Sequence, residues 1–135
     1  MFSITNGREA IHFEIARHIP KEEQHPYDEY FLRVWGQSSF ISFDKQVNTT
    51  LTDIKILYRE LKRCYQSRED ICVIPSLGYD EDFSISFFFD GRGSVRVCAE
   101  LLSVDWSRNR CTVEFDTDRT FIAETLRDIR ATFDA

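Results

Sequence analysis

The chain has 135 residues, the length of one ordinary domain, and it carries 12 Phe, five Tyr and two Trp beside a single Met. A chain of this length buries roughly two thirds of its unfolded surface, so we expect a single domain over residues 1–135 with an aromatic core. The net charge of −6 argues against nonspecific binding to nucleic acid, which needs a cationic surface, and no apolar run reaches the roughly 20 residues of a membrane helix.

The four cysteines indicate a reducing compartment. Cys64, Cys72, Cys98 and Cys111 are widely spaced and contain no CxxC pair, so buried free thiols are expected rather than a disulfide or metal framework. The first residues contain no cationic segment followed by an apolar run, which is the pattern of a secretory signal. The sequence therefore predicts a cytoplasmic protein.

The N-terminal half begins with a predicted hairpin. Residues 2–4 and 11–15 alternate between apolar and polar side chains on either side of Asn6-Gly7, the favoured two-residue hairpin turn. The periodicity then disappears over residues 17–29, which indicates a long exposed loop. Two further strands are expected at residues 30–37 and 39–47, with a bulge or a register change near Gly36.

Two helices are predicted from capping residues and apolar spacing. The first begins after Thr50, whose side chain can cap it, with Asp53 at the third helical position. Apolar residues then recur at steps of three and four over residues 51–65. The second helix begins between Thr117 and Thr120, either of which could cap it.

The strongest strand pattern lies between these helices. Residues 83–89, 95–101 and 111–115 alternate with the two-residue period of strands, and polar turns separate them. In the first of these strands one face is strongly apolar and the other mostly polar: Phe83, Ile85, Phe87 and Phe89 against Ser84, Ser86, Phe88 and Asp90. We therefore predict an antiparallel meander, preceded at residues 71–74 by either a brief strand or a buried crossover segment. Together the elements predict an α+β fold, an antiparallel β-sheet system of about six to eight strands with one helix inserted mid-chain and one C-terminal helix.

No catalytic or metal-binding constellation is recognisable in the sequence. It contains no GxSxG, HExxH, Walker or GxGxxG motif, and Gly91-Arg92-Gly93 lies between two strands, where a hairpin turn is expected rather than a phosphate-binding loop. The three histidines have no carboxylate or nucleophile placed to complete a catalytic set. The spacing of His18, Glu22 and His25 outside a helix fixes no metal geometry. We expect no enzyme activity, no metal and no cofactor.

Two acidic loops are the candidate partner-binding residues. The first contains Glu22, Glu23, Asp28 and Glu29, and the second contains Asp80, Glu81 and Asp82. Such runs are either solvated loops or surfaces that complement a basic protein by charge pairing. The residues themselves leave both interpretations open.

The junction between the last strand and the last helix resembles a known family. The motif is Phe115-x-x-Asp118-x-Thr120-Phe121-Ile122, followed by a helix through Leu126 and Ile129. It resembles the strand-to-helix junction of WapI-type immunity proteins, small bacterial proteins that neutralise a cognate toxin, and related uncharacterised bacterial domains share the layout. The order of elements over residues 38–133 is also similar, with a strand ending in Phe43, a helix with Leu57, Leu61 and Tyr65, an aromatic strand, and the turn at Gly91–Gly93.

This resemblance implies binding without catalysis. It implies a non-catalytic immunity-like protein that binds and neutralises a cognate toxin domain, a basic one if the acidic loops contact it. Two alternatives stay open: a structural or regulatory protein-interaction domain of a larger assembly, and a small-molecule-binding domain with its site between the sheet and a helix. The sequence does not predict the oligomeric state.

Overall fold

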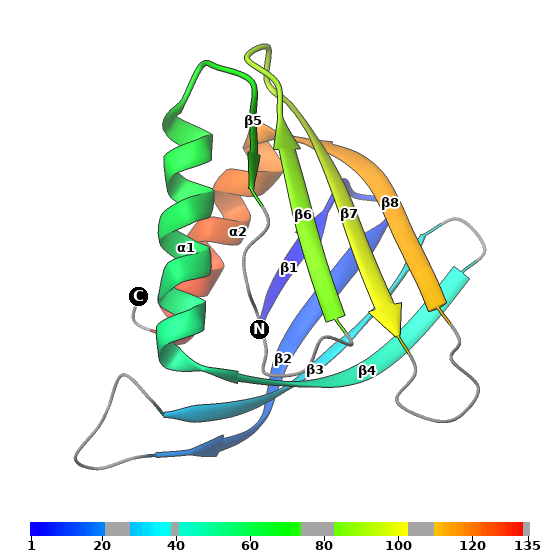
Figure 1. Ribbon diagram of the computed structural model, residues 1–135, viewed down its shortest axis with the longest axis vertical. Coiled ribbons are helices and arrows are strands. Elements are labelled where there is room, and N and C mark those ends of the chain that lie inside the picture. The colour runs from blue at the N-terminus through cyan, green and yellow to red at the C-terminus, as the bar shows by residue number, and fades with distance from the viewer. Residues whose placement is uncertain (21–27, 39–40, 74–82, 103–109, 134–135) are drawn as a thin grey trace.

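The structure is a computed structural model, and it describes residues 1–20, 28–38, 41–73, 83–102 and 110–133. The described residues form eight strands and two helices, so the predicted α+β class is confirmed, with one helix mid-chain and one at the C-terminal end (Figure 1). The elements are β1 (Phe2–Thr5), β2 (Ala10–Ile19), β3 (Glu29–Ser38), β4 (Ile41–Thr50), α1 (Leu51–Gln66), β5 (Ile71–Val73), β6 (Phe83–Phe89), β7 (Ser94–Leu102), β8 (Arg110–Asp118) and α2 (Arg119–Phe133).

The strands form two four-stranded antiparallel sheets, each a meander in chain order. The first sheet has the order β1-β2-β3-β4 and the second has the order β5-β6-β7-β8. In Figure 1 the second sheet faces the viewer and the first sheet curves behind it. Helix α1 connects the two sheets, and it packs against α2 on one side of the molecule. Neither helix in the described part of the chain is long and apolar enough to cross a membrane.

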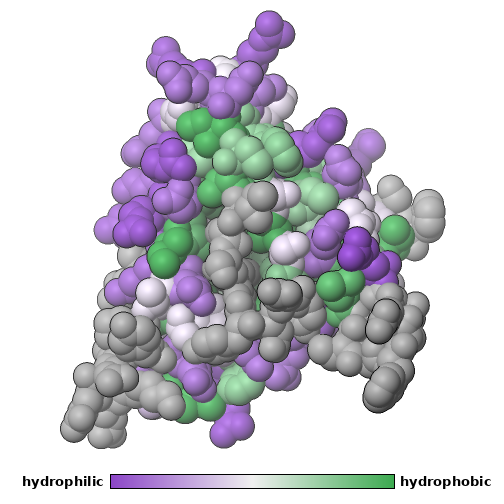
Figure 2. Space-filling model, in the orientation of Figure 1, coloured by the Kyte–Doolittle hydropathy of each residue, from purple (hydrophilic) through white to green (hydrophobic). Residues whose placement is uncertain are grey.

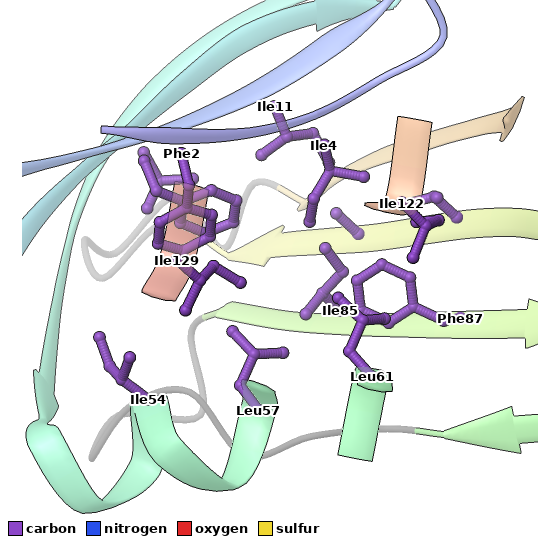
Figure 3. Packing of buried hydrophobic residues seen from close by; sticks show 14 of the residues in the cluster. Phe2, Ile4, Ile11, Ile54, Leu57, Leu61, Ile85, Phe87, Ile122 and Ile129 are labelled. Atoms are coloured by element: carbon purple, nitrogen blue, oxygen red, sulfur yellow. The ribbon is translucent and has the colours of Figure 1, made fainter. Parts of the chain in front are cut away.

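Both sheets and both helices contribute to one hydrophobic core. In Figure 3 side chains from all four parts point toward one another: Phe2, Ile4 and Ile11 from the first sheet, Ile85 and Phe87 from the second, Ile54, Leu57 and Leu61 from α1, and Ile122 and Ile129 from α2. Aromatic rings join the parts. Phe13 stacks on Phe2 with ring centroids 4.5 Å apart and meets Phe83 of the second sheet edge-on at 6.2 Å. Aromatic rings thus link the parts of the core, but most of its buried hydrophobic residues are Ile, Leu and Val, so the prediction of a core dominated by rings is wrong.

The predicted meander is present as β6, β7 and β8. Burial alternates along β6, so that Phe83, Ile85, Phe87 and Phe89 face the core, as predicted. The hydrogen-bonded register carries this alternation across the sheet, because Phe87 is paired with Val97 and Val97 with Phe115, all of them buried. The apolar run before the meander contributes the short strand β5, which pairs with β6.

The start of α1 is as predicted. The side-chain oxygen of Thr50 accepts a hydrogen bond from the backbone N–H of Asp53 at 3.2 Å, which satisfies one of the free donors of the first turn. At the other end, the guanidinium of Arg119 donates to the carbonyl oxygens of Tyr65 and Ser67. The first residue of α2 therefore satisfies carbonyl groups at the C-terminal end of α1.

The predicted caps of α2 are wrong. The helix begins at Arg119, and the backbone N–H of Phe121 donates to Oδ1 of Asp118 at 3.1 Å, so Asp118 caps it. Thr117 is instead buried at the end of β8, where its hydroxyl donates to the carbonyl of Thr5 at 2.6 Å. Thr120 is exposed inside the first turn.

The predicted bulge near Gly36 is also wrong. The pairing of β3 with β4 continues through Gly36 without a shift, and the irregularity of the first sheet lies between Ile15 and Arg17 of β2. Gly36 is required for another reason. A Cβ atom at this position would lie 1.9 Å from the carbonyl oxygen of Ala10 on the neighbouring strand. The glycine therefore marks a close backbone approach rather than an extra residue.

The first strand is tied to the last helix through side chains. Thr125 of α2 donates its hydroxyl to the carbonyl of Ser3 at 2.6 Å, beside the Thr117–Thr5 bond described above. The N-terminal ammonium of Met1 lies 3.3 Å from Oγ1 of Thr132, the second-to-last residue of the same helix. The edge strand β1 is thus held along its length by β8 and α2.

Candidate protein-interaction surface

Of the predicted acidic residues, the structure describes Asp28 and Glu29. Asp28 is 1 % exposed, and its Oδ2 lies 3.1 Å from Nε2 of His18, while its carbonyl accepts the N–H of Leu51 at 2.9 Å. Glu29 is half-buried at the start of β3. The remaining five, Glu22, Glu23, Asp80, Glu81 and Asp82, lie outside the described residues. Asp28 therefore makes internal contacts beside the start of α1.

The outer face of the second sheet carries a further group of acidic residues, which are not part of the two acidic loops. Strand register places Cys72, Phe88, Arg96 and Asp116 in one row across β5, β6, β7 and β8. The next row contains Ser86, Cys98 and Glu114. These residues alternate with the buried ones, so their side chains lie on the face turned away from the core.

This face is hollowed into an open groove of about 950 Å³. Its apolar part contains Ile71, Cys72, Phe88 and Cys98, and its charged part contains Asp70, Asp90, Glu114, Asp116 and Arg96. Phe88 is 49 % exposed, although the other phenylalanines of β6 are buried. Figure 2 shows this face, with hydrophobic residues gathered over β5 and β6 and hydrophilic residues around them.

The groove has an excess of negative charge. Among its lining residues four are acidic and one, Arg96, is basic. Nε of Arg96 lies 3.2 Å from Oδ1 of Asp116 and 3.5 Å from Oε1 of Glu114, so this cation already has two anionic neighbours. All three side chains are more than half exposed, and such pairs contribute little to stability. The groove therefore presents a negative potential around an apolar centre.

Hydrogen bonds from the turn after β6 favour the ionised form of Asp90. Its Oδ1 accepts backbone N–H groups from Arg92 at 2.8 Å and Ser94 at 3.0 Å, and these bonds lower the pKa of the Asp90 carboxyl below its usual range. Burial raises the pKa of the Cys98 thiol, and nearby Glu114 raises it further. The outer face thus combines the ionised carboxylate of Asp90 with the neutral thiol of Cys98.

The outer face of the first sheet is different, because its described charges are matched. Arg33 lies with its guanidinium 4.5 Å from the ring centre of Trp35 and 2.8 Å from Oδ2 of Asp44. The hydrogen bonds from Arg33 lower the pKa of the Asp44 carboxyl. Trp35 is half-buried there, with the ring of His12 at 5.2 Å.

Within the described residues, no group of three or more His, Cys, Asp or Glu is arranged to hold a metal ion. His12 pairs with the hydroxyl of Ser3 at 2.6 Å, and His18 stacks on Tyr30 at 4.3 Å beside its contact with Asp28.

Sequence reasoning placed Phe88 on the mostly polar side of its strand, but it did not single out Glu114 or Asp116. The alternation of β6 puts Phe88 on the mostly polar side, which is an available signal of an exposed aromatic residue. Joining Phe88 to Cys72 requires the register between β5 and β6, and nine residues of chain separate these strands without a hairpin turn signal. Placing Phe88 beside Asp116 requires both the β6–β7 register and the β7–β8 register.

No curated protein and no solved structure gives a significant match to the chain. The model of the Immunity protein WapI-like family matches residues 1–135, which extends the resemblance from the C-terminal junction to the N-terminal hairpin and confirms it. The chain therefore belongs to the WapI-like immunity protein family.

Proposed function

We propose that this protein is an immunity protein that binds a cognate bacterial toxin domain, blocks its activity and catalyses no reaction itself. The observation that carries the proposal is the family match over the whole chain. The net charge of −6 supports a toxin domain of basic character, since opposite charges steer association and disfavour wrong partners.

Neutralisation by binding is favoured by a surface that is ordered before the partner arrives. Strands β6, β7 and β8 pair without a register shift, and their inner faces pack into the shared core. A surface built on such strands loses little conformational entropy when it binds, which favours high affinity. The proposal includes the cytoplasm as the site of action, and the free state of all four cysteines, which lie in the described ranges, supports it.

The test is co-expression with the toxin domain encoded beside the gene. We expect bacterial growth to be restored when this protein is produced together with that domain, and a stoichiometric complex to be recovered by affinity purification. A toxin domain from an unrelated locus is the control and should stay toxic. Failure to restore growth, together with the absence of a complex, would contradict the proposal. A stable complex with other cellular proteins instead would favour the alternative of an interaction domain in a larger assembly.

A further inference from the structure

Phe88 is an exception to the pattern of its own strand. Its neighbours Phe87 and Phe89 are 0 % and 2 % exposed, whereas Phe88 leaves 49 % of its surface in water. A single exposed apolar residue is ordinary. Phe88, however, lies in a groove beside Ile71, Cys72 and Cys98, so its ring is part of a continuous apolar area. Aromatic residues in such positions commonly supply much of the binding energy of an interface.

The charges around Phe88 select the chemistry of the occupant. Asp70, Asp90, Glu114 and Asp116 border the groove, and Arg96 alone among its lining residues is basic. A membrane with anionic lipids or a nucleic acid would be repelled. Two copies of this face would also bring like charges together, which disfavours self-association. A basic protein surface matches both the charge and the apolar centre.

We infer that the toxin domain docks on the outer face of the second sheet, with an apolar side chain over Phe88 and with arginine or lysine side chains beside Glu114 and Asp116. The inference rests on the proposed function and names the surface through which it acts. The outer face of the first sheet is the natural comparison, because Arg33 and Asp44 neutralise each other there.

The first experiment measures affinity for the toxin domain encoded beside the gene by calorimetry. Phe88→Ser removes the apolar anchor and is expected to raise the dissociation constant by about thirtyfold or more. Glu114→Lys is expected to raise the dissociation constant by roughly tenfold at low salt. The increase should be smaller at high salt, because salt screens the charges.

Matched controls lie on the outer face of the first sheet. Phe31→Ser replaces a half-buried aromatic residue of β3, and Glu14→Lys changes the net charge by the same amount as Glu114→Lys. Both are expected to bind within about twofold of the wild type, since they lie outside the proposed surface. Thermal unfolding of every variant shows whether a loss of binding follows from a loss of folding.

The second experiment uses a native thiol of the groove as the probe. Cys72 is exposed and lines the groove opposite Phe88, so its labelling rate with a maleimide reports access to this surface. Saturating toxin domain is expected to slow the labelling of Cys72 at least about tenfold if it covers the groove. In a Cys72→Ala background, a thiol introduced by Glu14→Cys should be labelled at the same rate with and without the toxin domain.

The outcomes separate the two proposals. If the wild-type protein does not bind the toxin domain, the proposed function fails. If it binds, but Phe88→Ser and Glu114→Lys bind equally well and Cys72 stays accessible, the docking surface is wrong and the function stands. A homodimer that Phe88→Ser dissociates would make a second copy the occupant and would also overturn the inference.

Discussion

At the scale of single residues, Thr49 carries a specific energetic cost. Its Oγ1 is buried and has no hydrogen-bond partner among the described residues. An unpaired buried hydroxyl costs about 1–3 kcal/mol, so Thr49→Val, which keeps the shape and removes the oxygen, is expected to raise the free energy of unfolding by about 1 kcal/mol in urea titration. Thr125→Val is the matched control. Thr125 donates to Ser3 at 2.6 Å, so the same substitution there should destabilise.

Gly36 is sensitive for steric reasons. A Cβ at this position would lie 1.9 Å from the carbonyl oxygen of Ala10, and neither backbone can move without breaking the β2–β3 pairing. We expect Gly36→Ala to lower the free energy of unfolding by about 2–3 kcal/mol. The adjacent exposed residue serves as the control, because Gln37→Ala should change it by less than about 0.5 kcal/mol. Equal effects of the two substitutions in urea titration would contradict the steric explanation.

Asp90 links stability to pH. Because the pKa of Asp90 is lowered in the folded protein, its contribution is present above the unfolded pKa of about 4 and is lost as pH falls through the folded pKa. Asp90→Ala is therefore expected to lower Tm at neutral pH and to have a smaller effect in acid. Asp90→Asn keeps an acceptor oxygen and cannot titrate, so its Tm should lie closer to that of the wild type at neutral pH. The same Tm loss for Asp90→Ala at every pH would contradict this assignment.

At the scale of elements, α2 depends on Asp118 for its start. The carboxyl oxygen of Asp118 accepts the N–H of Phe121 at 3.1 Å, and replacing such a cap by Ala costs typically about 1 kcal/mol. We expect Asp118→Ala to destabilise the protein by that amount in thermal or urea unfolding. Thr120→Ala should change stability by less than about 0.5 kcal/mol, since Thr120 is exposed and caps nothing. A larger loss of stability for Thr120→Ala than for Asp118→Ala would indicate that Thr120 caps the helix.

The cap of α2 and the glycine of β3 show where sequence reasoning stops. Thr50 directly precedes the apolar spacing of its helix, and the sequence predicted this cap correctly. Thr117, Asp118 and Thr120 are all chemically able to cap, and the choice depends on Thr117 facing β1, a tertiary contact. Similarly, a strand glycine indicates either a bulge or a close approach, and the position of the neighbouring strand decides which.

The candidate surface was less predictable than the fold. Alternation along β6 was readable because a strand has a fixed period of two, so the buried and exposed sides of Phe87 and Phe88 follow from the sequence. The acidic loops were chosen because charge runs are visible in a sequence, yet Asp28 is internal and paired with His18. The acidic residues of the groove come from separate segments, because Asp90 follows β6 whereas Glu114 and Asp116 alternate along β8, and the strand register brings them together.

At the scale of the whole molecule, the shared core predicts cooperative unfolding. Phe13 of the first sheet meets Phe83 of the second, and Tyr30 and Phe2 both meet Phe133 of α2. Neither sheet buries its inner face without the other, so we expect residues 1–135 to unfold as a single domain in one transition. Circular dichroism and tryptophan fluorescence should then give coincident urea curves. Two resolved transitions would instead indicate that the sheets fold separately.

The bonds between β1 and α2 also bear on how the protein is made. The hydroxyl of Thr125 reaches the carbonyl of Ser3 across 122 residues of sequence, and that of Thr117 reaches Thr5 across 112. Strand β1 is therefore synthesised more than 100 residues before the segment that completes its contacts. The nascent chain carries Phe2 and Ile4 without their final cover until α2 has emerged, so the shared core is completed only after α2 has been synthesised.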